Sequence, residues 1–185
     1  MLGHVVVFLV SFFSLCLSHD GDGVHARMPE SKKAEITVTS GGFAEGGMIP
    51  KRYTCHGEDV SPSLRWTGIP KGAKSLALIC EDPDAPMGIW VHWVIFNMPT
   101  AMDGLASGVP SKEVVNRGAR CGVNDFGKLG YRGPCPPGGT HRYYFRLYAL
   151  DAEIDLESGI TRRQLLQAME GHILAEGHLM GKYER

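Results

Sequence analysis

The sequence predicts a mainly β domain with one main α-helix near its C-terminal end. Several apolar or alternating runs have the length and composition of strands, whereas only one segment has a convincing helical pattern. The chain also contains 24 glycines and 11 prolines, which favours many turns and few long helices. Its 185 residues fit a single folded domain, which we place at residues 34–185.

The charge balance argues against a nucleic-acid-binding protein. Lys and Arg total 19, Asp and Glu total 20, and the net charge is −1. The longest basic clusters, such as Lys51-Arg52, hold only two residues, whereas a nucleic-acid-binding face needs many basic side chains close together. We therefore expect no nucleic acid among the partners.

The N-terminal segment has the features of a secretion signal. Residues 5–17 form an apolar run of 13 residues, short for a membrane span but typical of a signal-peptide core. We expect residues 1–18 to be a signal peptide cleaved after Ser18, so that the protein is exported to the periplasm or secreted. Because only His4 and no Lys or Arg precedes the run, a retained membrane tether is the alternative. Residues 19–33 are polar and glycine-bearing, and are expected to be a flexible lead-in.

The cysteines predict at most one disulfide in the exported domain. Loss of Cys16 with the signal peptide would leave four cysteines. Cys80 lies in an apolar run, where a free thiol behaves as a small buried hydrophobe. The expected bond therefore joins two of Cys55, Cys121 and Cys135. Their spacing contains no close pair of the kind that binds zinc.

Strand signals recur through the first half of the domain. Residues 35–39 alternate polar and β-branched side chains, and residues 48–53 and 61–66 are candidate extended segments. Residues 76–81 and 91–98 are almost continuously apolar, which predicts central strands buried on both faces.

The second half begins with a long irregular segment. Residues 99–140 are rich in Gly, Pro, Asn and Asp, and only residues 113–116 look extended. Such segments are uncommon in compact domains and are often functional. Residues 141–150 then alternate and carry four aromatic side chains, the strongest strand signal in the chain. A last strand is expected at residues 179–183.

One helix is predicted to begin after Thr161. Thr161 and Gln164 fit the S/T-x-x-E/Q capping box. Apolar side chains then recur at three- and four-residue spacing up to Ile173, so His172 would lie on the helix and Gly177 would be its C′ residue.

Two stiff proline loops lie next to histidine-bearing strands. The first, residues 82–88, contains Asp-Pro-Asp-Ala-Pro and leads to His92; the second, residues 130–139, leads to His141. His141 and Tyr143 are two apart on a strand and so share a face, whereas Arg142 points to the other side. We expect Asp82 to orient one imidazole so that its other N–H faces an anion.

Several motifs in the same order resemble the phosphatidylethanolamine-binding protein family, in particular its bacterial and archaeal Raf-kinase-inhibitor-like branch. These motifs are Asp-Pro-Asp-Ala-Pro from Asp82, His92-Trp93, Gly-Pro-Cys-Pro-Pro from Gly133, and His141-Arg142-Tyr143, with Ser-Pro-Ser-Leu-Arg-Trp from Ser61 and Asn-Asp-Phe-Gly from Asn124.

The resemblance implies a fold and a site. The fold is a two-sheet antiparallel β-sandwich with a small pocket at one end that binds phosphate-containing ligands; some members inhibit kinases or serine proteases. Carried over by position, the anion-binding residues are Asp82, His92, Pro136, His141 and Tyr143, and the pocket walls are Ala85, Pro86, Trp90 and Gly133.

These residues allow other interpretations. The polar side chains could simply brace the sheet, or two histidines and Asp82 could hold a metal. A hydrolase would need a nucleophile, but neither Ser61 nor Ser63 lies in a G-x-S-x-G elbow. The sequence thus favours a non-enzymatic protein, without cofactor, metal or catalytic residues, that binds phosphate or a phosphorylated head group. The alternatives are a kinase or serine-protease inhibitor acting through its surface, and a metal-dependent or phosphoester hydrolase.

Overall fold

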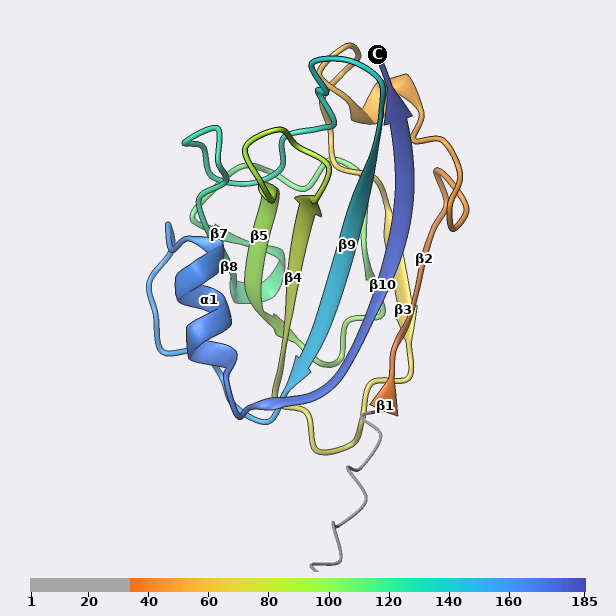
Figure 1. Cartoon of the computed structure of the whole chain (residues 1–185). Coiled ribbons are helices and arrows are strands. Elements are labelled where there is room, and N and C mark those ends of the chain that lie inside the picture. Colours follow the sequence, from red (N-terminus) through yellow and green to blue (C-terminus); the bar gives the residue numbers. More distant parts are fainter. Residues whose placement is uncertain (1–33) are drawn as a thin grey trace, which may run out of the picture. The chain divides into compact units, whose positions relative to one another are not determined.

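The computed structural model describes residues 34–185, in which a seven-stranded sheet packs against a three-stranded sheet (Figure 1). The larger sheet has the order β1-β10-β9-β4-β5-β8-β7 and the smaller one β2-β3-β6. All pairs are antiparallel except β1 with β10. The bounds are β1 Ala34–Glu35, β2 Thr37–Ser40, β3 Leu64–Thr67, β4 Ser75–Asp82, β5 Trp90–Pro99, β6 Gly104–Leu105, β7 Val114–Val115, β8 Ala119–Cys121, β9 Thr140–Leu150 and β10 Ile173–Glu184. The mainly β sandwich is confirmed.

Strand β4 is the centre of the larger sheet. It pairs with β5 on one side and with β9 on the other, and all eight of its residues are buried. This confirms the prediction that the apolar runs at 76–81 and 91–98 form strands covered on both faces, since a central strand loses its contact with water on each side.

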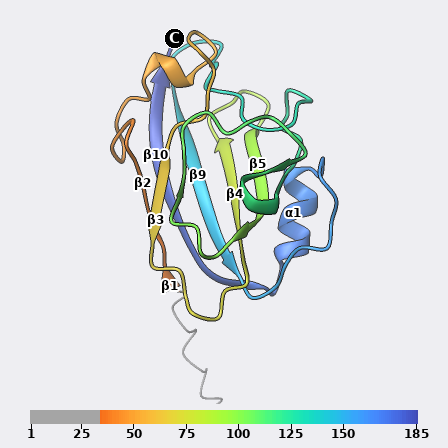
Figure 2. The ribbon, with the colours of Figure 1, turned by 180° about the vertical axis from the view of Figure 1, so that it is seen from behind.

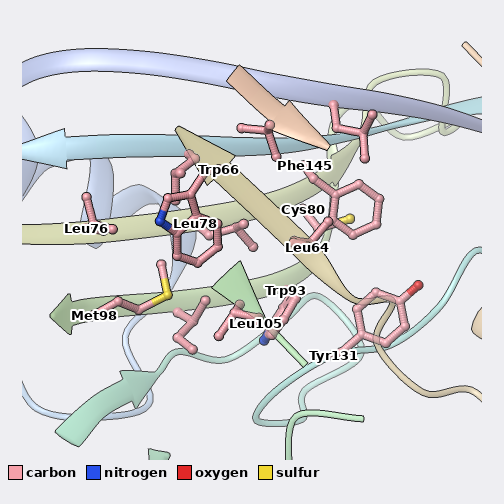
Figure 3. Packing of buried hydrophobic residues seen from close by; sticks show 14 of the residues in the cluster. Leu64, Trp66, Leu76, Leu78, Cys80, Trp93, Met98, Leu105, Tyr131 and Phe145 are labelled. Carbon is pink, nitrogen blue, oxygen red and sulfur yellow. The ribbon is translucent and has the colours of Figure 1, made fainter. Parts of the chain in front are cut away.

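The core lies between the two sheets, as Figure 3 shows for ten labelled side chains. Leu64 and Trp66 of β3 pack with Leu78 and Cys80 of β4 in this cluster. Strand β3 lies in front of the larger sheet when the molecule is seen from behind (Figure 2). A second cluster, which includes Leu165 of the helix, fills the opposite face of the larger sheet.

The helix α1, Arg162–Met169, begins with the predicted capping box: the Thr161 side chain accepts from the Gln164 backbone, and the Gln164 side chain accepts from the Thr161 backbone. The helix ends earlier than predicted, with Glu170 as its C-cap. His172 therefore lies beyond the helix, and Ile173 already belongs to β10.

Gly177 is a strand residue rather than the helix C′ residue. It lies within β10, and a Cβ atom there would come 1.8 Å from the Ile36 carbonyl oxygen. Glycine is needed because two backbones approach closely, a long-range contact that the local sequence does not reveal.

Two further predictions for local structure differ from the fold. Residues 48–53 form no strand; Met48 makes an isolated bridge to Lys182, and Lys51–Tyr53 is a 3₁₀ turn, η1. The segment 99–140 holds more short elements than expected, namely β6, β7, β8 and the 3₁₀ turn η2, Asn116–Gly118.

The expected signal peptide, its cleavage site after Ser18 and the lead-in at 19–33 lie outside the described residues, so export remains a prediction. Within residues 34–185, no helix has the length and apolarity needed to cross a membrane.

A buried ion-pair cluster attaches α1 to the larger sheet. The Glu81 carboxylate, whose side chain is 5% exposed, accepts from Arg146 Nε and from Arg162 Nε, each at 2.6 Å. Glu81 faces away from the core between the sheets, on the side that the helix covers. One carboxylate therefore holds the start of α1 against β4 and β9.

Replacing Glu81 with Gln should lower the free energy of unfolding by about 3 kcal/mol, because two half-buried guanidinium groups lose their counter-charge. The matched control is Asp103→Asn, which removes the acceptor of Arg65 in an exposed pair of similar length, 2.7 Å, and should cost less than about 1 kcal/mol. Urea unfolding followed by tryptophan fluorescence compares the two. Equal losses would show that the helix is held by apolar packing alone.

Candidate functional site

The polar residues singled out in the sequence come from one end of the larger sheet. Strand β4 ends there and β5 and β9 begin there, because the three are antiparallel neighbours (Figure 1). Side chains at the last residue of β4 and the first residues of β5 and β9 are consequently brought together across the sheet.

A buried hydrogen bond joins β9 to the end of β4. His141 Nδ1 lies 2.7 Å from Asp82 Oδ2, and the two side chains are 9% and 4% exposed. The other carboxylate oxygen of Asp82 accepts from the Asp84 backbone N–H at 2.8 Å, as is common where Asp precedes a turn. Both Asp82 oxygens are thus used, and the expectation that Asp82 orients a histidine is met by His141.

A second link joins Arg142, the next residue of β9, to Asp84 in the loop after β4. Arg142 donates to the Asp84 carboxylate from its backbone N–H, Nε and Nη2, at 2.6–2.9 Å. The Arg142 guanidinium lowers the pKa of the Asp84 carboxyl to about 2. Arg142 therefore points away from His141 and toward a carboxylate, as predicted, and it holds the Asp-Pro-Asp loop against the start of β9.

His92 reaches the same cluster because β5 carries a bulge. Cys80 lies opposite Trp93, but Glu81 lies opposite Val91, so His92 is an extra residue in the ladder. A bulge of this kind re-aims a side chain and is frequent next to functional sites. His92 Nδ1 lies 2.7 Å from the Arg132 carbonyl oxygen. Burial lowers the pKa of His92 from its ordinary value.

Tyr143 completes the cluster and has a hydroxyl group without a partner. Its ring meets the His92 ring edge to face, with centroids 5.2 Å apart. The residue is fully buried, and its hydroxyl has no partner with hydrogen-bond distance and angle, although the Asp82 carboxylate and the Cys135 backbone lie near it. Burial first, and the charge of Asp82 next, raise the pKa of Tyr143 well above its usual value. We call Asp82, His92, His141 and Tyr143 the polar cluster.

The second proline loop is fixed from several directions. Gly133 N donates to Asp59 Oδ1 at 2.6 Å, and a Cβ on Gly133 would lie 2.3 Å from the Tyr53 carbonyl oxygen, so only glycine fits. A disulfide joins Cys55 to Cys135. This bond is one of the predicted pairings, and Cys80 and Cys121 are free and buried.

The predicted pocket walls differ in their surroundings. Gly133 is buried, Ala85 and Trp90 are half-buried, and Pro86 is exposed; Pro136, predicted to bind the anion, is buried. Trp90 packs edge to face against Phe126, with ring centroids 5.5 Å apart.

Three contributors were not identified from the sequence. Phe126 also lies 5.4 Å from the His92 ring and beneath the Arg132 guanidinium. Asp59 holds the loop, and Asp84 holds the start of β9. The Asn-Asp-Phe-Gly motif was the only available signal for Phe126; nothing in the local sequence marks Asp59.

The tautomers set what the cluster can do. A carbonyl oxygen can only accept, so His92 Nδ1 carries the proton and Nε2 of the neutral ring is an acceptor. An ionised Asp82 places the His141 proton on Nδ1 in the same way. The prediction that an oriented histidine faces an anion with a free N–H therefore applies to His141 only when its ring is doubly protonated. The neutral ring carries its one hydrogen on Nδ1.

The residues considered for other chemistries are arranged differently. Ser61 is buried, and its Oγ accepts from the Val109 backbone N–H at 3.0 Å. Within residues 34–185, no three His, Cys, Asp or Glu side chains are grouped in a way that could hold a metal ion.

Comparisons with known proteins agree with the fold. The sequence model described as phosphatidylethanolamine-binding protein matches residues 39–184. A UPF0098 protein of Methanothermobacter thermautotrophicus is 57% identical over 143 residues, which cover 77% of this chain and 95% of that protein.

Two solved structures are also similar. A candidate phosphatidylethanolamine-binding protein homologue from Chlamydia trachomatis has a TM-score of 0.74 and 44% identity, covering 82% of this chain and 98% of its own. The E. coli protein YbcL, described as a new member of the mammalian PEBP family, has a TM-score of 0.77 and 32% identity, covering 82% and 99%.

Removal of the disulfide should destabilise the domain and not only the loop. The Cys55→Ser/Cys135→Ser double variant should lose about 3–4 kcal/mol of unfolding free energy, because the bond closes a long loop with a sequence separation of 80. Urea unfolding measures the loss. A reductant should bring the wild type to the level of the variant and leave the variant unchanged. An unaltered wild-type midpoint after full reduction, verified by thiol counting, would contradict the prediction.

Proposed function

The chain belongs to the phosphatidylethanolamine-binding protein family, and we propose that it is a non-enzymatic binding protein that holds a small anion at the polar cluster. The anion is phosphate or a phosphorylated head group. The proposed site residues are Asp82, His92, His141 and Tyr143, with the loop at Pro136 as a border; Asp82 acts by holding His141, and the other three contact the ligand.

The observation that carries the proposal is the buried Tyr143 hydroxyl without a hydrogen-bond partner. Buried polar groups that only brace a fold are nearly always paired, because an unpaired one costs about 1–3 kcal/mol. Glu81, on the opposite face of the same sheet, is an example of a buried group that only stabilises the fold, since both of its oxygens accept hydrogen bonds from arginines. A ligand oxygen would supply the partner that Tyr143 lacks.

The charges around the cluster favour one small anion over a polyanion. Two guanidinium groups of the neighbouring segments already have carboxylate partners: Arg132 pairs with Asp59 at 2.7 Å and Arg142 with Asp84 at 2.6 Å. The Tyr143 hydroxyl and the Nε2 atoms of the two imidazoles remain for the ligand. The family resemblance supports phosphate as the central group, and no described feature of the outer surface favours a kinase or protease partner.

Replacing His141 with Ala should weaken binding of inorganic phosphate by about tenfold or more, the effect of one lost charged hydrogen bond. The matched control is His172→Ala. His172 Nδ1 also lies 2.7 Å from a carboxylate, that of Asp151, but both side chains are nearly half exposed. Isothermal titration calorimetry should find the wild-type affinity in this control. Equal phosphate affinity in both variants would contradict the proposed site.

Tyr143→Phe separates binding from folding in the same assay. It removes only the unpaired hydroxyl, so the domain should gain about 1 kcal/mol of unfolding free energy while phosphate binding weakens several-fold. A variant that instead loses stability would show that the hydroxyl braces the fold.

A further inference from the structure

We infer that the polar cluster prefers an oxyanion that carries its own hydroxyl hydrogen, a phosphomonoester monoanion or dihydrogen phosphate, over a phosphodiester. The inference rests on the proposed function and adds the ligand class. It follows from the hydrogen bonds of two imidazole rings, which determine the atoms left for the ligand.

His92 offers the ligand a lone pair. Its Nδ1 must donate to the Arg132 carbonyl oxygen, 2.7 Å away, because that oxygen has no hydrogen. The residue is 2% exposed, and burial lowers the pKa of its imidazole, which favours the neutral ring. Nε2 is therefore an acceptor, which repels an oxygen lone pair but receives a P–OH hydrogen.

His141 Nε2 can be either a hydrogen-bond acceptor or a donor. Its Nδ1 is bonded to Asp82, so the neutral ring also presents a lone pair at Nε2. A second proton, taken from solvent, converts Nε2 into a charged donor while Asp82 supplies the counter-charge. Because His92 has only a carbonyl at Nδ1, His141 is the ring better suited to become an imidazolium when an anion binds.

Tyr143 adds the remaining donor. Its hydroxyl is neutral and unpartnered. The cluster thus offers one acceptor, His92 Nε2, and two donors, His141 Nε2–H and Tyr143 O–H. A phosphomonoester monoanion presents one P–OH and two unprotonated oxygens, which match this set, whereas a phosphodiester monoanion has no hydrogen for His92.

The neighbouring charges do not change this assignment. Burial lowers the pKa of His92 and is the largest effect; the Arg132 backbone, the charge of Asp82, the Gly133 backbone and the charge of Asp125 oppose it. Tyr183, which lies opposite His141 on β10, bonds to His56. The titratable and charged groups around the two rings are Asp82, Asp84, Asp125, Arg132, Arg142, Tyr143 and Tyr183.

Two isomeric probes test the preference. Ethyl phosphate and dimethyl phosphate have the same atoms, and near pH 5.5 both are mainly monoanions, but only ethyl phosphate has a P–OH. Calorimetry with the full chain should show ethyl phosphate binding about tenfold tighter, since a hydrogen bond replaces a lone-pair repulsion. The His92→Phe variant should bring the two affinities within about threefold of each other.

A second measurement on the wild-type protein covers the case in which His92→Phe fails to fold. At pH 7.5, ethyl phosphate is mainly a dianion, so its binding should take up about one proton or more. Titrations in two buffers of different ionisation enthalpy measure that uptake. Equal affinities for the two isomers, or binding without proton uptake, would overturn the preference and leave the anion site standing. If neither probe nor phosphate binds, the proposed function itself fails.

Discussion

The hydrogen bond between His141 and Asp82 is the interaction on which the candidate site depends. It joins two buried side chains that are 59 residues apart in sequence, and the Arg142–Asp84 pair repeats the link one position further along β9. Together these contacts fix the first proline loop to the beginning of β9. The disulfide between Cys55 and Cys135 fixes the second loop, so both sides of the cluster are held before any ligand arrives.

The two faces of the larger sheet use buried polar groups differently. Toward α1, Glu81 has both oxygens bonded to arginines, and the result is a fixed helix. Toward the core between the sheets, His141 and His92 each use only Nδ1, and the Tyr143 hydroxyl has no bond. A buried polar atom without a hydrogen-bond partner lowers the stability of the fold. Proteins keep such atoms mainly at functional sites, where a ligand can pair with them. Trp93 Nε1, in the residue after His92, is also buried without a partner, so the contrast supports the position of the site and does not by itself identify each binding residue.

The sequence predicted what depends on local periodicity. Alternation along residues 141–150 placed His141 and Tyr143 on one face, and apolar runs located the central strands. It did not predict the bulge that aims His92, because a bulge depends on the register with a distant strand. The same limitation explains the two wrong predictions for the end of the helix and for the role of Gly177. Position 177 must be glycine because the Ile36 backbone lies against it. The Asp59–Gly133 contact likewise pairs residues that no local pattern connects.

The central claim is that an anion binds at the free Nε2 atoms of His92 and His141. Nitrogen-15 spectra of the histidine side chains, recorded while phosphate is added, test it most directly. In the free protein, both rings should be protonated at Nδ1. Phosphate should then shift the Nε2 signals of these two rings, move His141 toward the doubly protonated form, and leave His172 unchanged. Phosphate binding that leaves both Nε2 signals in place would contradict the account.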